Sequence, residues 1–211
     1  SPAPELEKGT FDYIREPKSD CFSVGFAKTD VMPDDMDKTA YYVAGYRMNN
    51  PAKGVLDPMT ASAVWIDDLS GRGGVVFVSI DDIGLTNYDV GIIRDLLADF
   101  KKESGCRSIN IMSIHNHASI DTVGLWGPLP RSGRNKKYME LLAQKVKQVV
   151  FDAYNDRRDG DLYYGKKEAE AIQRDSRLPE VYSKDVHRFR FVPKDGSREV
   201  WIINFASHTE S

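Results

Sequence analysis

Three of the four histidines in this chain of 211 residues stand where a predicted strand ends. His115 and His117 follow an apolar run over residues 109–114, and His208 follows another over residues 200–205. Neutral imidazole is the commonest zinc ligand in proteins, and a catalytic zinc takes three protein ligands and keeps a position for water or substrate. Side chains two residues apart in an extended segment point to the same side, so His115 and His117 are predicted to address a common centre.

Two carboxylates, Asp81 and Asp82, follow a further apolar run over residues 75–80. The carboxyl ends of parallel strands meet at one edge of a sheet, so we expect these carboxylates and the three imidazoles to gather there. An H-x-H pair also arises by chance, and the alternative interpretation is a set of polar residues that cap strand ends. For the two aspartates, capping or the orientation of a histidine is as consistent with the pattern as direct chemistry.

Hydrophobic spacing predicts the elements that position these residues. Apolar or alternating runs predict strands over residues 21–27, 60–67, 75–80, 109–114, 161–165, 188–192 and 200–205. Apolar residues three and four apart predict helices over 89–104 and 135–155. A strand, a helix and a strand between residues 75 and 114 form a βαβ unit, which implies a parallel pair. We therefore predict an α/β fold: a mixed, largely parallel sheet with helices packed on it and the site at the carboxyl ends of strands.

Composition divides the chain into an N-terminal arm and one larger unit. Residues 1–20 are rich in Pro, Glu, Lys and Asp and are predicted to form a flexible arm, followed by one unit over 21–211. The loop at 32–58 carries three tyrosines, and a long aromatic loop is more often functional, or packed over a site, than idle. The last predicted strand ends in a short polar tail, from which we expect the natural polypeptide to continue.

The charges, the cysteines and the apolar runs exclude some kinds of partner and site. The chain has 29 Lys and Arg against 32 Asp and Glu, with no basic stripe, so nucleic acid is not an expected partner. The two cysteines are far apart in the sequence, which excludes a zinc site made of cysteines. No run of about 18 apolar residues is present, so the sequence predicts no spanning helix.

Several segments, in the same order, resemble the neutral/alkaline ceramidase family. Residues 113–122 (SIHNHASIDT) and 124–127 (GLWG) resemble its H-T-H-S-G-P-D segment. Residues 24–31 (VGFAKTDV) look like its opening V-G-x-A-x-x-D-I-T segment, and residues 44–46 (AGY) and 54–58 (GVLDP) look like its G-Y and G-I-x-D-P loops. Residues 78–81 (VSID) and 202–208 (IINFASH) are similar to its V-S-x-D and I-N-F-A-x-H strand ends. The resemblance extends from Ser23 to His208.

The resemblance implies a zinc-dependent hydrolase that acts on an N-acyl (amide) linkage in a lipid-like small molecule such as ceramide. It also implies a secreted or cell-surface location. His115 and His208 match the family's two zinc-binding histidines, and His117 matches the histidine that contacts the substrate carbonyl and the oxyanion. Arg174, in residues 172–175 (IQRD), matches a substrate-contacting arginine, and Asp82 is assigned to substrate binding with it.

The chain departs from the family in two respects. The S-G-P that follows the second histidine of the family reads Ala118-Ser119-Ile120. The family's nucleophilic serine and two further zinc ligands, a Glu and a Tyr, lie C-terminal to the I-N-F-A-x-H block. By resemblance, this is the N-terminal part of a catalytic domain, which binds zinc weakly, is inactive alone and needs the C-terminal remainder of the same polypeptide. Two alternatives stay open: a metal-dependent hydrolase of another ester or amide, and a non-catalytic ceramidase-like binding module.

Overall fold

The computed structural model describes residues 20–169 and 172–208. The flexible segment predicted over residues 1–20 therefore lies outside the described residues, except for Asp20. The strands are β1 (Phe22–Asp30), β2 (Thr60–Asp67), β3 (Val75–Ile80), β4 (Ser108–Ser113), β5 (Arg158–Glu168), β6 (Asp185–Pro193) and β7 (Val200–Phe205). The helices are α1 (Asn87–Leu96), α2 (Ala98–Ser104) and α3 (Lys136–Asn155). The strand and helix periodicities of the sequence therefore predicted every one of these elements, except that the helix predicted over residues 89–104 divides into α1 and α2 around Leu97.

These strands form one seven-stranded sheet in the order β4-β3-β2-β1-β5-β6-β7. The predicted α/β class and mixed sheet are confirmed, but the prediction that the sheet is largely parallel is wrong. Only β3 and β4 pair in parallel, and every other neighbouring pair is antiparallel. The physical reason is connectivity. A parallel pair needs a crossover, which α1 and α2 supply between β3 and β4, whereas the short connections 68–74 and 194–199 can join only antiparallel strands.

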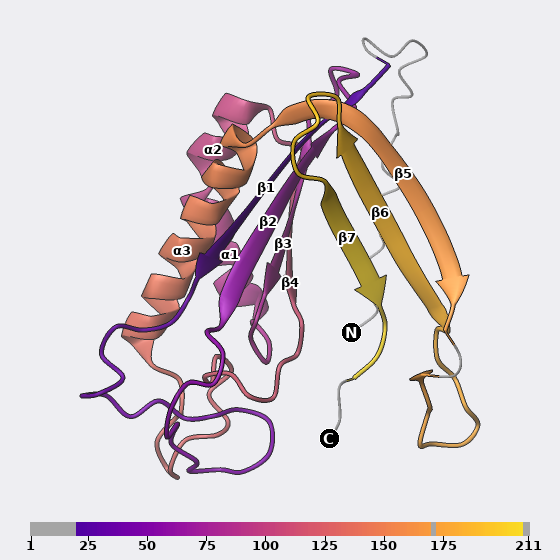
Figure 1. The fold of residues 1–211 in the computed structure, drawn as a ribbon. Coiled ribbons are helices and arrows are strands. Elements are labelled where there is room, and N and C mark those ends of the chain that lie inside the picture. The colour runs from indigo at the N-terminus through magenta and orange to yellow at the C-terminus, as the bar shows by residue number, and fades with distance from the viewer. Residues whose placement is uncertain (1–19, 170–171, 209–211) are drawn as a thin grey trace, which may run out of the picture.

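Strand β5 divides the sheet into a first arm, β4-β3-β2-β1, and a second arm, β5-β6-β7. Its opening residues pair with β1 only where Phe22–Val24 lie opposite Arg158–Gly160, while Gly160–Glu168 pair with β6. The strand therefore leaves β1 near Gly160, and Figure 1 shows the second arm folding back from the first. A side chain at Gly160 would overlap the Val192 carbonyl and the Phe191 ring, so the bend requires a glycine.

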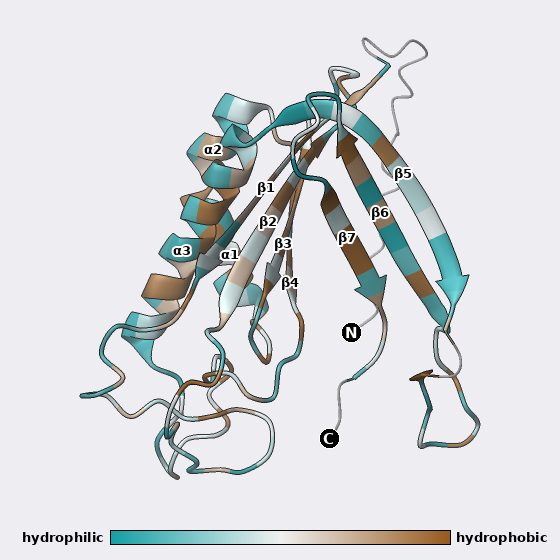
Figure 2. Cartoon of the chain, viewed as in Figure 1, coloured by the Kyte–Doolittle hydropathy of each residue, from teal (hydrophilic) through white to brown (hydrophobic). Residues whose placement is uncertain are grey.

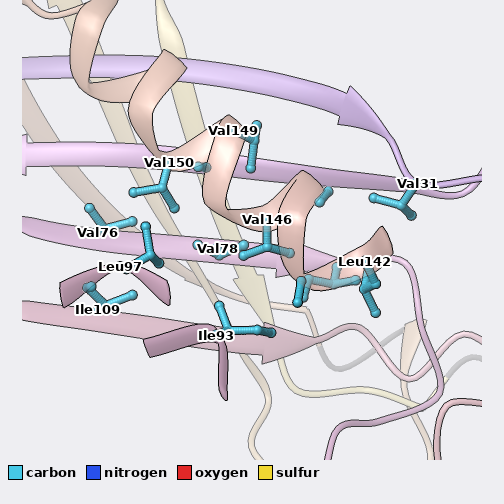
Figure 3. Close-up of a cluster of buried hydrophobic side chains, with 14 of the residues drawn as sticks. Val31, Val76, Val78, Ile93, Leu97, Ile109, Leu142, Val146, Val149 and Val150 are labelled. Atoms are coloured by element: carbon cyan, nitrogen blue, oxygen red, sulfur yellow. The ribbon is translucent and has the colours of Figure 1, made fainter. Parts of the chain in front are cut away.

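Two cores hold this arrangement together. The larger core lies between the helices and the first arm (Figure 3), and its buried side chains include Val76, Val78, Ile93, Leu97, Ile109, Leu142, Val146, Val149 and Val150. A smaller core joins the two arms and consists of Val24, Val64, Phe191 and Val200. Apolar and polar residues alternate around α3 (Figure 2), as expected for a helix that buries one face against a sheet.

The first turn of α1 is stabilised by a capping box. The Thr86 hydroxyl accepts a hydrogen bond from the Asp89 backbone N–H, and the Asp89 carboxylate accepts one from the Thr86 backbone N–H. Asp89 also forms a salt bridge with Arg134, which ties the start of α1 to the segment that leads into α3.

None of the helices in the described part of the chain combines the length and the apolar character needed to cross a lipid bilayer.

Candidate metal site

The imidazoles of His115, His117 and His208 converge at one end of the molecule. The Nε2 atom of His117 lies 3.0 Å from Nε2 of His115 and 3.1 Å from Nε2 of His208. One ring nitrogen from each residue lies within 4.8 Å of the other two. The convergence of three strand-end histidines that the sequence predicts is therefore present.

The route by which these histidines meet differs from the prediction. His115 follows β4 and His208 follows β7, and these strands hold the two outermost positions of the sheet instead of lying side by side. Their carboxyl ends meet because the second arm folds back at β5, which places the end of β7 at the same end of the molecule as the end of β4 (Figure 1). Residues 91 positions apart, His117 and His208, come into contact in this way.

The backbone turns at His115 instead of remaining extended. The prediction that His115 and His117 lie on the same side of an extended segment is therefore wrong. His115 has φ of +62°, in the left-handed region that only a few per cent of residues other than glycine adopt. Such a conformation persists where the surrounding structure imposes it, and it is commonest at functional sites. The His115 and His117 rings therefore meet across a turn, with their centroids 4.6 Å apart.

Hydrogen bonding determines which nitrogen of His115 faces the cluster. Nδ1 lies 2.7 Å from the backbone carbonyl oxygen of Ile83. A carbonyl only accepts, so Nδ1 carries the proton and donates it, and Nε2 of the neutral ring presents a lone pair to the other two histidines. Histidines that bind metals usually donate their other ring N–H to a carbonyl or a carboxylate in this way, which fixes the tautomer and the ring orientation.

The three Nε2 atoms fit a shared cation. A proton on Nε2 of His117 can be directed to His115, but the same nitrogen then has no lone pair for His208. A cation bound between these nitrogens removes the conflict, because a ring whose lone pair is bound by the cation needs no proton from its neighbour. Zinc–nitrogen bonds of 2.0–2.1 Å in a tetrahedral site imply nitrogen separations of about 3.3 Å, and the two separations from His117, 3.0 and 3.1 Å, are close to that value. The donor set could therefore hold a metal ion.

Two aspartates at the end of β3 have different environments. Asp81 Oδ2 accepts hydrogen bonds from the backbone N–H and the hydroxyl of Thr60, at 2.9 and 2.7 Å, and so joins the end of β3 to the start of β2. Asp82 is 1% exposed, and neither carboxylate oxygen has a partner within full hydrogen-bonding geometry among the described residues, although the Ser113 side chain is near enough to oppose part of the pKa rise. Burial raises the pKa of Asp82 to about 7, and the nearby negative charges of Asp81 and Asp89 act in the same direction. Its contact with substrate stays a prediction.

Arg174 and the fourth histidine of the chain, His187, lie outside the cluster. Arg174 is exposed, and its neighbour Gln173 donates a hydrogen bond to the carbonyl of Ala206, two residues before His208. The contact of Arg174 with substrate remains a prediction. His187 lies on β6, where it shares a hydrogen bond of 2.8 Å with the hydroxyl of Tyr164.

Sequence reasoning missed the residue that shapes the loop after His117. The Asp121 carboxylate is fully buried and accepts hydrogen bonds from the backbone N–H groups of Val123, Gly124 and Trp126. An aspartate that precedes a glycine-containing segment is the signal that could have indicated this turn.

The aromatic loop expected to be functional, or packed over a site, does reach the cluster. The Tyr46 ring lies 5.0 Å from the His117 ring, edge to face. Tyr46 is itself 59% exposed, so it borders the cluster on its solvent side.

Comparisons with known proteins place the fold. No family model and no curated protein matches the chain. Among solved structures, a ceramidase complexed with C2 superposes with a TM-score of 0.64 at 16% identity over 83% of this chain and 29% of that chain. Neutral ceramidase from Pseudomonas aeruginosa superposes with a TM-score of 0.60 at 15% identity over 84% of this chain and 30% of that one. The chain thus spans less than a third of the length of these ceramidases, and over that part it has a neutral ceramidase-like fold.

Proposed function

We propose that this chain is the N-terminal part of a zinc-dependent, ceramidase-like hydrolase that cleaves an N-acyl (amide) linkage in a lipid-like substrate. The observation that carries the proposal is the meeting of three imidazoles, with nitrogen separations of 3.0 and 3.1 Å, at strand ends in a ceramidase-like fold. When bound, zinc supplies a Lewis acid that polarises the amide carbonyl.

Each residue of the proposed site has a separate role. His115 and His208 hold the zinc, and the Ile83 carbonyl keeps the His115 ring oriented. His117 donates a hydrogen bond to the oxygen on which negative charge develops. Asp82 is assigned to the substrate-binding set from its position at the end of β3, and Arg174 belongs to it by resemblance. The remaining ligands and the nucleophile are assigned to the C-terminal remainder of the polypeptide, and a secreted or cell-surface location is proposed on the same basis.

Zinc binding by the chain itself tests the metal site. Competition against a chromophoric chelator should give a zinc affinity that His115→Ala and His208→Ala each lower by at least about 10-fold, because each removes one ligand. His187→Ala is the matched control, since that histidine lies on β6, bonded to Tyr164. Equal zinc affinity in all four proteins would contradict the proposed site.

Activity separates the proposal from its alternatives. The polypeptide extended beyond Ser211 should hydrolyse a fluorescent N-acylsphingosine, whereas the 211-residue chain alone should not. Zinc binding with hydrolysis of esters only would favour a hydrolase of another substrate class. Neither zinc nor turnover in the extended protein would favour a binding module.

His117 has its own test in the extended protein. His117→Ala should leave the zinc content near stoichiometric and lower kcat by about 10²- to 10³-fold, the range for the loss of one oxyanion donor. His115→Ala should remove the zinc. Equal loss of zinc in both variants would make His117 a third ligand and overturn this division of roles.

A further inference from the structure

We propose that Gly45 and Tyr46 are positioning residues that set the orientation of the His117 imidazole. The His117 ring occupies the space where a side chain at residue 45 would lie. A Cβ on Gly45 would be 2.5 Å from His117 Cγ, 2.6 Å from Nδ1 and 2.7 Å from Cβ. Real Cβ atoms do not approach other atoms this closely, so any other residue at position 45 must displace the ring or the backbone.

The backbone around Gly45 has little freedom to move away. The Ala44 N–H donates to the Ser119 carbonyl at 2.9 Å, and the Asp121 N–H donates to the Tyr42 carbonyl at 2.8 Å. Residues 43 and 120 form an isolated β-bridge between these two bonds. The loop is thus hydrogen-bonded to the segment that carries His117. Rotation of the ring can move Cγ and Nδ1 only in part and leaves Cβ in place, so a side chain at residue 45 displaces the ring together with residue 117.

Tyr46 borders the same ring. Its ring meets that of His117 edge to face, with centroids 5.0 Å apart and planes inclined by 65°. Besides burying surface, an edge-to-face aromatic pair prefers one relative orientation of its two rings. The contact with Tyr46 therefore favours one position of the His117 ring. Gly45 leaves the space for the ring, and Tyr46 holds it there.

The orientation matters because Nε2 of His117 lies between those of His115 and His208. A rotation of the ring moves this nitrogen out of the cluster. The positioning itself does not depend on any activity, but its consequence for catalysis rests on the proposed function. The two are therefore measured separately.

Nuclear magnetic resonance of the metal-free chain measures the positioning. Gly45→Ala should shift the ring-proton resonances of His117 because it moves the imidazole relative to the Tyr46 ring, and Tyr46→Ala should shift them because it removes that ring and frees the imidazole to reorient. Tyr46→Phe should leave them within the linewidth, since it keeps the edge-to-face contact. The resonances of His187, on β6, serve as an internal reference in every spectrum.

Two glycine variants separate the steric effect from other consequences of a glycine replacement. Gly45 has φ of +111°, where a side chain is strained even without a clash. Gly196 also has a positive φ, +72°, and a Cβ added there would have nothing within 4 Å, so Gly196→Ala reports the effect of a side chain at positive φ without the clash. Gly54 lies in the same long loop as Gly45, and a Cβ added there would also have nothing within 4 Å. Gly54→Ala therefore reports neither the clash nor the strain. Both should leave the His117 resonances unchanged. A Gly45→Ala spectrum that matches these controls, or a Tyr46→Phe spectrum that matches Tyr46→Ala, would overturn the proposal.

Catalysis is the second readout. In the extended protein, Gly45→Ala should lower kcat by about 10²- to 10³-fold while zinc content stays near stoichiometric, as for the loss of His117. A shift of the His117 resonances without any change in kcat would support the positioning and contradict the catalytic role of His117. Thermal unfolding of Tyr46→Ala and Tyr46→Phe shows whether either variant is misfolded, and the two variants keep the test decisive if Gly45→Ala does not fold.

Discussion

Asp82 has a more buried environment than a polar residue at the end of a strand suggests. A carboxyl group with 1% exposure favours its neutral form, and this burial outweighs the opposing contribution of the Ser113 side chain, so the pKa of Asp82 rises from 3.8 to about 7. The folded state then binds the Asp82 proton more tightly than the unfolded state does. The stabilising contribution is complete below pH 3.8 and is lost as the pH rises toward about 7.

We predict that Asp82→Asn removes this dependence. The free energy of unfolding of the wild-type chain should fall between about pH 4 and pH 7 by an amount on the order of 1–4 kcal/mol that the variant does not lose. Urea unfolding across this range, with a chelator present to exclude metal effects, measures the difference. Asp161→Asn, at an exposed position of β5, should keep the wild-type slope. Parallel pH profiles for Asp82→Asn and the wild type would show that Asp82 ionises normally in the fold.

Helix α3 is the element that supports the first arm. Its buried face consists of Tyr138, Leu142, Ala143, Val146, Val149, Val150 and Ala153, and it packs on β1 and β2 in the larger core. The site at the ends of the strands depends on this packing, since β4 and β3 lie in the same arm.

Leu142→Ala should therefore lower the free energy of unfolding by about 2–5 kcal/mol, because Leu142 is fully buried and its loss leaves a cavity. Gln144→Ala, at an exposed position of the same helix, should change it by less than about 0.5 kcal/mol. Denaturant midpoints compared at constant slope give both values. A loss below about 1 kcal/mol for Leu142→Ala would mean that the core closes around the missing side chain.

The whole molecule depends on the bend in β5, because His208 reaches His117 only through the fold-back of the second arm. Gly160 lies at that bend, in contact with Phe191 of the smaller core. Any change that opens the angle between the arms separates the two outermost strands of the sheet.

We expect Gly160→Ala to lower the zinc affinity of the chain by about 10- to 100-fold, the range found when the orientation of a ligand is lost. Gly165→Ala is the control on the same strand, since its new Cβ would be 3.6 Å from Arg188, an ordinary contact. Zinc titrations below the unfolding temperature of each variant make the comparison. If Gly160→Ala binds zinc as the wild type does, the bend is not what brings His208 to the cluster.

Much of the local structure could be predicted from the sequence. The predicted limits of β2, β3 and β7 match the observed ones, and those of α3 differ by one residue, because burial on one or both faces leaves a local period of apolar residues along the chain. The histidines were found for the same reason: each follows the end of such a period. The break at Leu97 was missed because both helices share one apolar face, and a single residue interrupts them.

The tertiary structure alone decided how those histidines meet. Antiparallel pairing, the outermost positions of β4 and β7, the fold-back at Gly160, the left-handed backbone of His115 and the place of Gly45 beside His117 all depend on contacts between distant residues. Local periodicity records which face of an element is buried, not which element covers it. The sequence by itself therefore determined which residues are placed at strand ends, and only the folding of one arm of the sheet onto the other determined that three of them share a centre.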